Sequence, residues 1–400
     1  MNLSSVIRHP SSYRMPAEWE KQAAIWLAWP HNKEDWPDKF EPIPWVYAEI
    51  IRHIARSQMV RLVVQNDKEQ KRATDVLERA GVNMKHIKWH VIPTDRIWLR
   101  DSGPIFVKPV DGGRWTADKK KQSPSSVIRH PSSVMLDWRF NAWAKYPNHK
   151  KDDLVPEKIF EYFRHRPNRH GDSRAIQLDS PRILQKQNSG NDVTIIQPMH
   201  KGKRVVLEGG SIDVNGKGTL ITTEECLLSK IQCRNPGFTC DDYAEVFATY
   251  LGIDQIIWLG NGIVGDDTHG HVDDITRFVK ADTIVTVVEK DKRDDNYSLL
   301  QDNLKRLKKA RDAKGNAFNI IELPMPRPVV FEGQRLPASY ANFLICNEVV
   351  LVPTFNDPMD RIALNILAEC FPKREVVGIH AVDLVWGLGT IHCMSQQEPA

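Results

Sequence analysis

The stretch VVLVPTFNDPMDRIALNILAECFPKREVVGIH, Val349 to His380, alternates apolar runs with a segment of helical periodicity. Its two ends, Val349 to Val352 and Glu375 to His380, predict strands. The segment between them, Pro358 to Cys370, predicts a helix. A strand, a helix and a second strand in succession indicate an α/β fold.

The same alternation continues along the chain. Apolar residues at helical spacing predict a helix over about 44 to 56. Further segments follow the pattern, with helices at Asp67 to Ala80, closed by Gly81, and at about 294 to 313, and strands at Met59 to Val64, Lys88 to Ile92 and Thr283 to Val288. No glycine-rich phosphate loop accompanies them, so a nucleotide-binding version of the fold is not favoured.

The composition is that of an ordinary soluble globular protein. The 400 residues are 41% hydrophobic and 26% charged, and the formal net charge of +4 is spread out without a nucleic-acid-binding motif. No apolar stretch approaches the roughly 18 to 20 residues that span a bilayer, and the first residues lack the apolar core of a signal peptide. We therefore expect a cytoplasmic protein that binds neither nucleic acid nor membrane.

Six cysteines are present, at positions 226, 233, 240, 346, 370 and 393. Because no secretion signal is apparent, we expect reduced thiols rather than disulfides. The seven-residue spacing of the first three is not that of a zinc finger. Most are interpreted as buried apolar residues, whereas Cys393 lies in surroundings that indicate chemistry.

Two polar segments, near 112–134 and 165–203, interrupt the alternation. Both are expected to be surface insertions in a single catalytic domain of residues 13–400, and residues 1–12 are expected to be a disordered leader. The first insertion contains SSVIRHPSS, Ser125 to Ser133, an identical copy of Ser4 to Ser12. Such a repeat indicates either a recent duplication or an imperfect gene model.

Two short stretches place an acid beside a turn. Asp101 follows an apolar strand end in WLRDSGP, Trp98 to Pro104, and Glu208 follows another in VLEGGSIDVNGKG, Val205 to Gly218. Both are candidates for ligand binding, because sites are commonly built at turns between strands. Alternatively, Asp101 caps its own turn, and Glu208 is exposed beside a hairpin that the Asn-Gly pair of its stretch indicates.

A third stretch, GDDTHGHVDD at Gly265 to Asp274, alternates histidine with aspartate. If it begins a strand, His271 and Asp273 share one face, because side chains repeat every two residues, and a base then lies beside a carboxylate. A Zn²⁺, Fe²⁺ or Mn²⁺ site that uses His269, His271 and Asp273 is the alternative. The stretch alone does not decide between acid–base chemistry and a metal.

The fourth stretch is the tail WGLGTIHCMSQQEP, Trp386 to Pro399, which carries Cys393 beside His392. A structural cysteine is the alternative to a functional one. Taken together, the four stretches fit the chemistry of a guanidinium group. Two or more carboxylates bind such a cation, a thiolate can attack its resonance-stabilised carbon, and one histidine can protonate departing ammonia and then activate water.

On these residues the chain resembles the agmatine deiminases, which belong with the Porphyromonas-type peptidyl-arginine deiminases in the guanidine-modifying superfamily. The similar stretches are RMPAEWEKQAAIWLAWPHNKEDWP (Arg14 to Pro37), LRDSGPIFV (Leu99 to Val107), DWRFNAW (Asp137 to Trp143), LEGGSIDVNGKG (Leu207 to Gly218), GDDTHGHVDDITRF (Gly265 to Phe278) and GTIHCMSQQEP (Gly389 to Pro399). They span nearly the whole chain. The resemblance implies a five-bladed α/β propeller (pentein) of ββαβ units with pseudo-fivefold symmetry and a central acidic site.

The resemblance also implies roles for individual residues. Cys393 matches the nucleophile, His271 matches the general acid and base, and no metal or other cofactor is expected. The carboxylates that match catalytic positions are those of Asp101, Asp273 and Glu208. The residues implied in substrate binding are Asp101, Glu208, Asp273, Asp267 and Trp98.

The implied reaction is hydrolysis of agmatine to N-carbamoylputrescine and ammonia through a covalent amidino-cysteine intermediate, a step of putrescine biosynthesis, in a homodimer. Arginine deiminase is a near alternative, which requires a cation such as Arg277 to face the pocket. A peptidyl-arginine deiminase requires an open cleft, and an amidinotransferase replaces water by an amine. A guanidinium-binding relative without activity and a metallohydrolase are the remaining alternatives.

Overall fold

The computed structural model describes residues 11–110, 133–164, 183–184 and 193–400. The strands are β1 (Tyr13–Arg14), β2 (Gln22–Ala28), β3 (Met59–Val64), β4 (Ile87–Val91), β5 (Ile105–Pro109), β6 (Ser133–Leu136), β7 (Ile183–Leu184), β8 (Val193–Ile196), β9 (Met199–His200), β10 (Lys203–Arg204), β11 (Asp213–Val214), β12 (Thr219–Thr223), β13 (Gln255–Leu259), β14 (Thr276–Lys280), β15 (Thr283–Val288), β16 (Asn319–Pro324), β17 (Val330–Phe331), β18 (Gln334–Arg335), β19 (Leu344–Ile345), β20 (Val349–Thr354), β21 (Glu375–His380) and β22 (Ser395–Pro399).

The α-helices are α1 (Ile43–Ile54), α2 (Asp67–Arg79), α3 (Leu99–Ser102), α4 (Val155–Arg164), α5 (Glu224–Leu228), α6 (Cys240–Leu251), α7 (Asn296–Lys309) and α8 (Pro358–Cys370). Short 3₁₀ turns are η1 (Lys33–Asp35), η2 (Met84–His86), η3 (Ala142–Ala144), η4 (Asp152–Leu154), η5 (Gly209–Ser211), η6 (Val272–Asp274) and η7 (Leu384–Gly387). No helix in the described part of the chain is long and apolar enough to cross a membrane.

The mixed α/β architecture repeats one pattern of strand pairing in five sheets. Among the described residues, the sheets of three or more strands have the orders β22-β2-β3-β4, β1-β5-β6-β8-β7, β11-β12-β13, β14-β15-β16 and β19-β20-β21. In each of them a central strand pairs antiparallel with one neighbour and parallel with another, as β15 does with β14 and β16. Helix α1 connects the parallel strands β2 and β3, and α2 connects β3 to the parallel β4. In the other sheets the parallel strands are connected by α4, by α5 with α6, by α7 and by α8.

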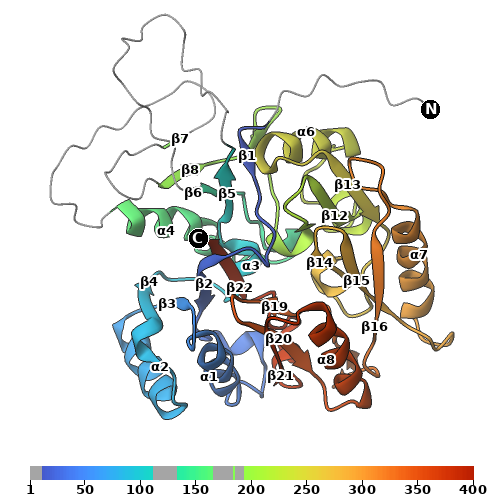
Figure 1. The fold of residues 1–400 in the computed structure, drawn as a ribbon. Helices are drawn as coiled ribbons and strands as arrows, with labels where there is room; N and C mark the ends of the chain where they lie inside the picture. The colour runs from blue at the N-terminus through green and yellow to red at the C-terminus, as the bar shows by residue number, and fades with distance from the viewer. Residues whose placement is uncertain (1–10, 111–132, 165–182, 185–192) are drawn as a thin grey trace, which may run out of the picture.

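The sheets follow one another around the middle of the molecule, and the C-terminus lies there (Figure 1). The C-terminal strand β22 pairs antiparallel with β2, so residues of the tail lie beside residues near the start of the chain. The turn that precedes β22 is therefore held by a sheet whose other strands come from the first quarter of the sequence. This closure positions the tail stretch that contains Cys393.

Local sequence explains why these elements form where the periodicity predicts them. The strands β3 and β15, the helix α8 and the strand β21 have the predicted bounds. Helix α8 begins with proline after Asp357, whose carboxylate caps the first turn in a capping box with Asp360. Strand β15 is buried on both faces because parallel and antiparallel neighbours and helix α7 surround it. The other predicted elements are present with ends shifted by a few residues.

The α/β prediction is confirmed, and four local expectations are wrong. Residues of the polar segment 165–203 form β8, β9 and β10 instead of a loop, because Val193–Ile196 supplies a β-branched run that pairs with β6. Ser133 and Val134 of the other segment also lie in a strand, β6. His271 and Asp273 lie at η6 rather than on a strand, and Asp101 lies in helix α3 rather than at a strand tip. The repeated segment up to residue 132 lies outside the described residues, as do residues 1–10 of the expected leader.

Candidate active site

The candidate side chains come from one short helix, two 3₁₀ turns and one loop. Asp101 lies in α3, Glu208 directly precedes η5, and Asp273 lies in η6, with His271 at its N-terminal cap. Cys393 lies in the turn that leads into β22. Helix α3 contacts both η5 and β22, and η5 contacts η6. The four sequence stretches are thereby brought together.

A cavity of about 220 Å³ reaches this group of turns. Its lining includes Asp101 and Cys393, together with the predicted substrate-binding residues Trp98 and Asp267. The predicted residues His271, Glu208 and Asp273 do not line the cavity, and each of them is fully buried. They lie next to the two inner lining residues, because His271 is 3.9 Å from Asp101 and Asp273 is 3.8 Å from the Cys393 sulfur.

Asp101 is a buried carboxylate held by two donors. The indole Nε1 of Trp143 donates to Oδ2 over 2.9 Å, and the backbone N–H of Gly210 donates to Oδ1 over 3.1 Å. Burial raises the pKa of Asp101 to about 6, although the charge of His271 opposes this rise. A side chain at Gly210 would collide with His271, since a Cβ there would lie 2.5 Å from Nδ1 of its ring. Glycine is therefore required for this close approach.

The turn that carries Trp143 has an unusual backbone. Ala142, Trp143 and Ala144 all have positive φ, between 49° and 57°, which is the left-handed region. Three successive residues in that region cost about 1–2 kcal/mol each, so packing elsewhere must hold them there. This backbone conformation allows the Trp143 indole to donate to Asp101, and both residues line the cavity.

His271 lies between carboxylates on both sides of its ring. Nδ1 is 3.9 Å from Asp101 and 4.0 Å from Asp273, and Nε2 is 3.7 Å from Glu208. Within the described residues, neither ring nitrogen has a hydrogen-bond partner. Burial works against the charged imidazole, but the carboxylate of Asp101 and the contacts with Cys226 and Glu208 outweigh it and raise the pKa of His271 well above its ordinary value.

Glu208 is paired with a buried arginine that the sequence analysis did not identify. Nε of Arg234 donates to both carboxylate oxygens, over 3.0 and 3.2 Å, and the Arg234 guanidinium also donates to backbone carbonyls of Gln232 and Thr268. Burial opposes ionisation, but Arg234 and His271 hold the pKa of Glu208 below its ordinary value. Glu208 therefore remains a carboxylate beside the histidine.

Asp273 connects the site to a second buried network. His392 Nδ1 lies 2.6 Å from Oδ2 of Asp273, and His392 Nε2 lies 2.8 Å from Glu18. Glu18 also accepts from Arg277 over 2.5 Å. Burial opposes ionisation of Asp273, but the hydrogen bond and charge of His392 lower its pKa. Its other oxygen, Oδ1, has no hydrogen bond within the described residues, so it is an acceptor available to a ligand.

Cys393 is buried, and Asn342 holds its loop. The side-chain amide of Asn342 donates to the sulfur over 3.0 Å, and its carbonyl oxygen accepts from Thr390 Oγ1 and the backbone N–H of His392. Burial and the nearby carboxylates of Asp273, Asp274 and Asp101 raise the pKa of the Cys393 thiol well above its ordinary value. In the empty site the thiol is thus the stable form.

The outer part of the cavity combines aromatic rings with charged side chains. Trp98 lines it and packs against Trp36, with ring centroids 5.7 Å apart. The carboxylate of Asp267 is paired with Lys145 and accepts from Tyr146 Oη over 2.7 Å, so both of its oxygens already have partners. The other charged lining residues are Glu34, Asp35 and Arg96, of which the last two form an ion pair.

The structure does not assemble the metal ligands that the sequence left open. His269 is directed to Ser229, over 3.1 Å, and to Glu225, over 3.8 Å. Within the described residues, the groups that could hold a metal ion are Glu208 with Cys226 and His271, and Asp273 with Asp274 and Cys393. Neither group contains His269, so the ligand set of His269, His271 and Asp273 is wrong.

Several residues around the site were not identified from the sequence: Glu18, Arg234, Asn342 and His392 as partners, and Asp274 and Cys226 as neighbours. Glu18 and Asn342 carried no local signal, because they act on residues far away in sequence. His392 was noticed only as the neighbour of Cys393. A buried Arg234 beside Glu208 could have been found only from a pairing across 26 residues.

Comparisons with known proteins cover nearly the whole chain. A model of the family described as Porphyromonas-type peptidyl-arginine deiminase matches residues 14–399. The chain is 33% identical over 411 residues to the agmatine deiminase of Stutzerimonas stutzeri (strain A1501), covering 97% of this chain and 96% of the relative, and 32% identical to that of Pseudomonas aeruginosa (strain UCBPP-PA14) with the same coverage. A solved structure of the agmatine deiminase of Enterococcus faecalis is similar with a TM-score of 0.77 and 29% identity, covering 97% of this chain and 96% of that one.

Proposed function

The chain belongs to the Porphyromonas-type peptidyl-arginine deiminase family, and we propose that it is an agmatine deiminase, a hydrolase of the C–N bond of a guanidinium group. The products are N-carbamoylputrescine and ammonia. The observation that carries this proposal is a buried imidazole and two buried carboxylates that lie directly behind a thiol and a third carboxylate, which line one cavity. These groups supply what a planar cation with an unreactive carbon requires.

Asp101 and Asp273 bind the guanidinium. Both carboxylates are buried and lie about 4 Å from Nδ1 of His271. Oδ1 of Asp273 has no hydrogen bond within the described residues. A guanidinium offers its N–H donors in a fixed plane, so carboxylates on two sides fix its orientation as well as its charge. Its carbon is thereby presented to Cys393, which lies 3.8 Å from Asp273.

Cys393 is the nucleophile, and the substrate itself favours its thiolate. In the empty site, burial and three carboxylates raise the pKa of the thiol. A bound guanidinium places a positive charge among the same carboxylates, which reverses the electrostatic penalty on a second anion. The amide of Asn342, which donates to the sulfur over 3.0 Å, stabilises the thiolate further.

His271 moves the protons of both half-reactions. The Cys393 sulfur forms a bond to the guanidinium carbon, and His271 gives a proton to the departing nitrogen, which leaves as ammonia. Water then adds to the amidino-thioester while His271 accepts a proton from it, the C–S bond breaks, and the ureido product leaves with the thiolate restored. The raised pKa of the imidazole, with Asp101 and Glu208 beside it, suits its first role as an acid.

The charges of the cavity favour agmatine over arginine. Arg277, the cation considered as a partner for a substrate carboxylate, is fully buried and bonded to Glu18, Asp213 and the backbone carbonyl of Phe343. Of the residues that the structure describes, four acids and one arginine line the cavity, and this arginine, Arg96, is already paired with Asp35. A diamine-like cation such as agmatine meets a net negative wall, whereas the carboxylate of arginine meets repulsion.

The five sheets are proposed to be the blades of a pseudo-fivefold propeller. The support is the shared order of antiparallel and parallel pairing, with a helical connection between the parallel strands. An experimental structure in which successive sheets are related by one fifth of a turn would establish it. The homodimer and the cytoplasmic location expected from the sequence stay predictions, as does the place of the reaction in putrescine biosynthesis.

The test is ammonia release from agmatine, arginine and a peptidyl-arginine, measured for the wild type and Cys393→Ala side by side. We expect release from agmatine, strongly preferred over the other two, and its loss in the variant. Release chiefly from arginine or from the peptide would replace agmatine as the substrate. Consumption of agmatine that depends on an added amine, with an amidino-amine as product, would instead indicate an amidinotransferase.

A further inference from the structure

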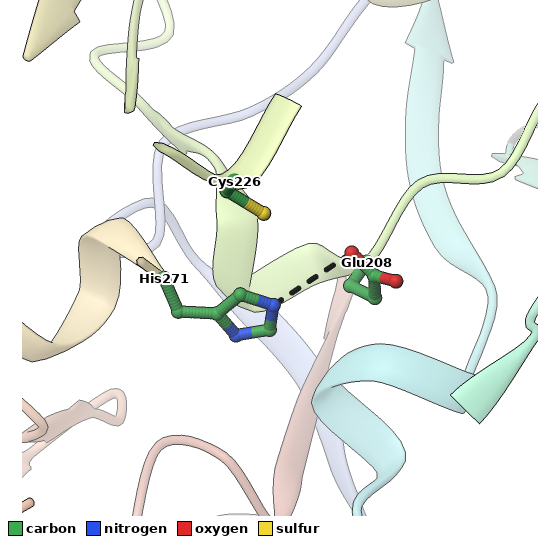
Figure 2. A group of neighbouring side chains, drawn as sticks. All are labelled: Glu208, Cys226 and His271. Atoms are coloured by element: carbon green, nitrogen blue, oxygen red, sulfur yellow. Dashed lines mark ion pairs between the residues drawn. The ribbon is translucent and has the colours of Figure 1, made fainter. Parts of the chain in front are cut away.

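A cluster behind the catalytic histidine contains a cysteine that the reaction does not use. Candidate ligand atoms of Glu208, Cys226 and His271 all lie within 4.8 Å of one another, and all three residues are buried (Figure 2). Cys226 comes from the short helix α5, where Thr223 caps its backbone N–H over 3.0 Å. The loop and cap hold the thiol against the imidazole.

The two nitrogens of His271 face different groups. Nδ1 faces Asp101 and Asp273, the carboxylates assigned to the guanidinium, whereas Nε2 lies 3.7 Å from Glu208. The fully buried imidazole has no hydrogen-bond partner at either nitrogen within the described residues. Its Nε2 side is therefore an unoccupied coordination position that already has a thiol and a carboxylate beside it.

These groups match the ligands that zinc prefers. Thiolate, imidazole and carboxylate bind Zn²⁺ at about 2.0 to 2.3 Å, which places ligand atoms roughly 3.3 to 3.7 Å apart in a tetrahedral site. The distance from His271 Nε2 to Glu208 is 3.7 Å already. The Cys226 sulfur lies within 4.8 Å of the other two ligand atoms, so it has to approach them by at most roughly 1.5 Å.

The charge around the cluster also suits a dication. The carboxylates of Glu208, Asp101 and Asp273 are close to the imidazole, and the arginine paired with Glu208 is Arg234. Arg234 does not exhaust the Glu208 carboxylate, because each of its oxygens has two lone pairs. The cation selectivity that serves a guanidinium therefore serves Zn²⁺ equally well.

We propose that Glu208, Cys226 and His271 form a zinc site that switches the enzyme off reversibly. Zn²⁺ displaces two protons, one from the Cys226 thiol and one from Nε2 of the His271 imidazolium, and both pass to solvent as the ion binds the sulfur, Nε2 and one Glu208 oxygen. No group is oxidised or reduced. The inhibitory part of this proposal rests on the proposed function, since it requires His271 to be the proton carrier, whereas zinc binding itself does not.

The mode of inhibition follows from the geometry. Zinc on Nε2 leaves Asp101, Asp273 and Cys393 free, so the substrate still binds, but the imidazole can no longer exchange its second proton. We therefore expect kcat to fall while KM for agmatine stays within about twofold. Zinc at the other cluster, Asp273 with Asp274 and Cys393, would instead compete with the substrate and raise KM.

The binding experiment uses the full chain with Co²⁺ and Zn²⁺ alone. A charge-transfer absorption on addition of Co²⁺ reports a thiolate ligand, and displacement by Zn²⁺ gives the zinc affinity. Changing residues that merely support a metal ligand costs about 10- to 100-fold in affinity, so losing the thiolate ligand in Cys226→Ala is expected to cost at least about 100-fold and abolish the band. Cys393→Ala and the matched control Cys233→Ala are expected to retain the absorption band and the zinc affinity.

The outcomes separate this proposal from the proposed function. A band that persists in Cys226→Ala, that is lost in Cys393→Ala, or that is absent from the wild type at saturating Co²⁺ overturns the zinc site, whatever the activity. If Cys226→Ala does not fold, Cys226→Ser replaces it, and survival of the band in the alanine variants of the other five cysteines assigns it by elimination. Tight zinc binding that leaves kcat unchanged would overturn the inhibitory role alone.

Discussion

Two buried histidines contact the same carboxylate and differ in how they are held. His392 has a carboxylate at each ring nitrogen, Asp273 over 2.6 Å and Glu18 over 2.8 Å. His271 lies 4.0 Å from the same Asp273 and has no hydrogen bond at either nitrogen within the described residues. His392, Asp273 and Glu18 form a hydrogen-bonded network. The carboxylates around His271 attract its charge without hydrogen-bonding to its ring.

This difference indicates what each histidine does. A group that must give and accept protons needs ring nitrogens that are not fixed in hydrogen bonds, and both nitrogens of the buried His271 meet this condition within the described residues. Both ring nitrogens of His392 bond to carboxylates from distant parts of the chain, and these bonds fix the turn that carries Cys393. We therefore expect changes around His271 to alter turnover and changes around His392 to alter folding.

The largest expected effect is loss of turnover in His271→Asn. Because the imidazole serves both half-reactions, kcat is expected to fall by about 10³-fold or more in a variant that remains folded. Steady-state ammonia release and urea unfolding measure the two. The matched control is His269→Asn, which removes a histidine bonded to Ser229 and should leave kcat close to wild type. Equal losses in both variants would contradict the contrast.

The next effect is on stability, in Glu18→Gln. Removing one charge from the buried network that joins His392, Glu18 and Arg277 is expected to lower the free energy of unfolding by about 3 to 5 kcal/mol. Urea denaturation measures it. Glu20→Gln is the control, because Glu20 forms a partly exposed pair with Arg14 whose loss should cost less than about 1 kcal/mol. A Glu18 variant with wild-type stability would show that the network does not hold the fold.

How far the sequence predicted these regions follows from the range of the interactions. Strand β15 and helix α8 were predicted with their bounds, because apolar runs and end caps are local signals. The catalytic stretches were recognised as turns rich in acids, His and Cys. The closed network could not be predicted, because Glu18 meets His392 across 374 residues only when β22 pairs with β2. The strand β8 was not predicted, because its four β-branched residues lie within a segment that is otherwise polar.

A smaller effect is expected at Asp101, which lies next to His271 and also lines the cavity. Trp143→Phe keeps the ring but removes the donor to Asp101 Oδ2, so the carboxylate that binds the guanidinium is less well oriented and ionised. The expected loss is about tenfold in kcat/KM, since a hydrogen bond to a charged group contributes about 1.5 kcal/mol or more. Trp45→Phe changes an exposed tryptophan and serves as the control. An unchanged kcat/KM would show that the Trp143 hydrogen bond to Asp101 does not contribute to the reaction.

The smallest effect sharpens the comparison through pH. Because burial and the Asp273 carboxylate raise the pKa of the Cys393 thiol, its thiolate fraction in the free enzyme is low at pH 7 and grows about tenfold per pH unit below that pKa. Alkylation of Cys393 by iodoacetamide, followed by peptide mass analysis, should show this rise. Asp273→Asn lowers the pKa of the thiol and should accelerate alkylation at pH 7. A pH-independent rate would contradict the raised pKa.

The most direct test of the central claim is the mass of the enzyme quenched by acid during turnover of agmatine. The account predicts a covalent adduct equal in mass to agmatine less ammonia, located on the peptide that contains Cys393 and absent from Cys393→Ala. An adduct on another residue, or steady ammonia release by a folded Cys393→Ala enzyme, would contradict it.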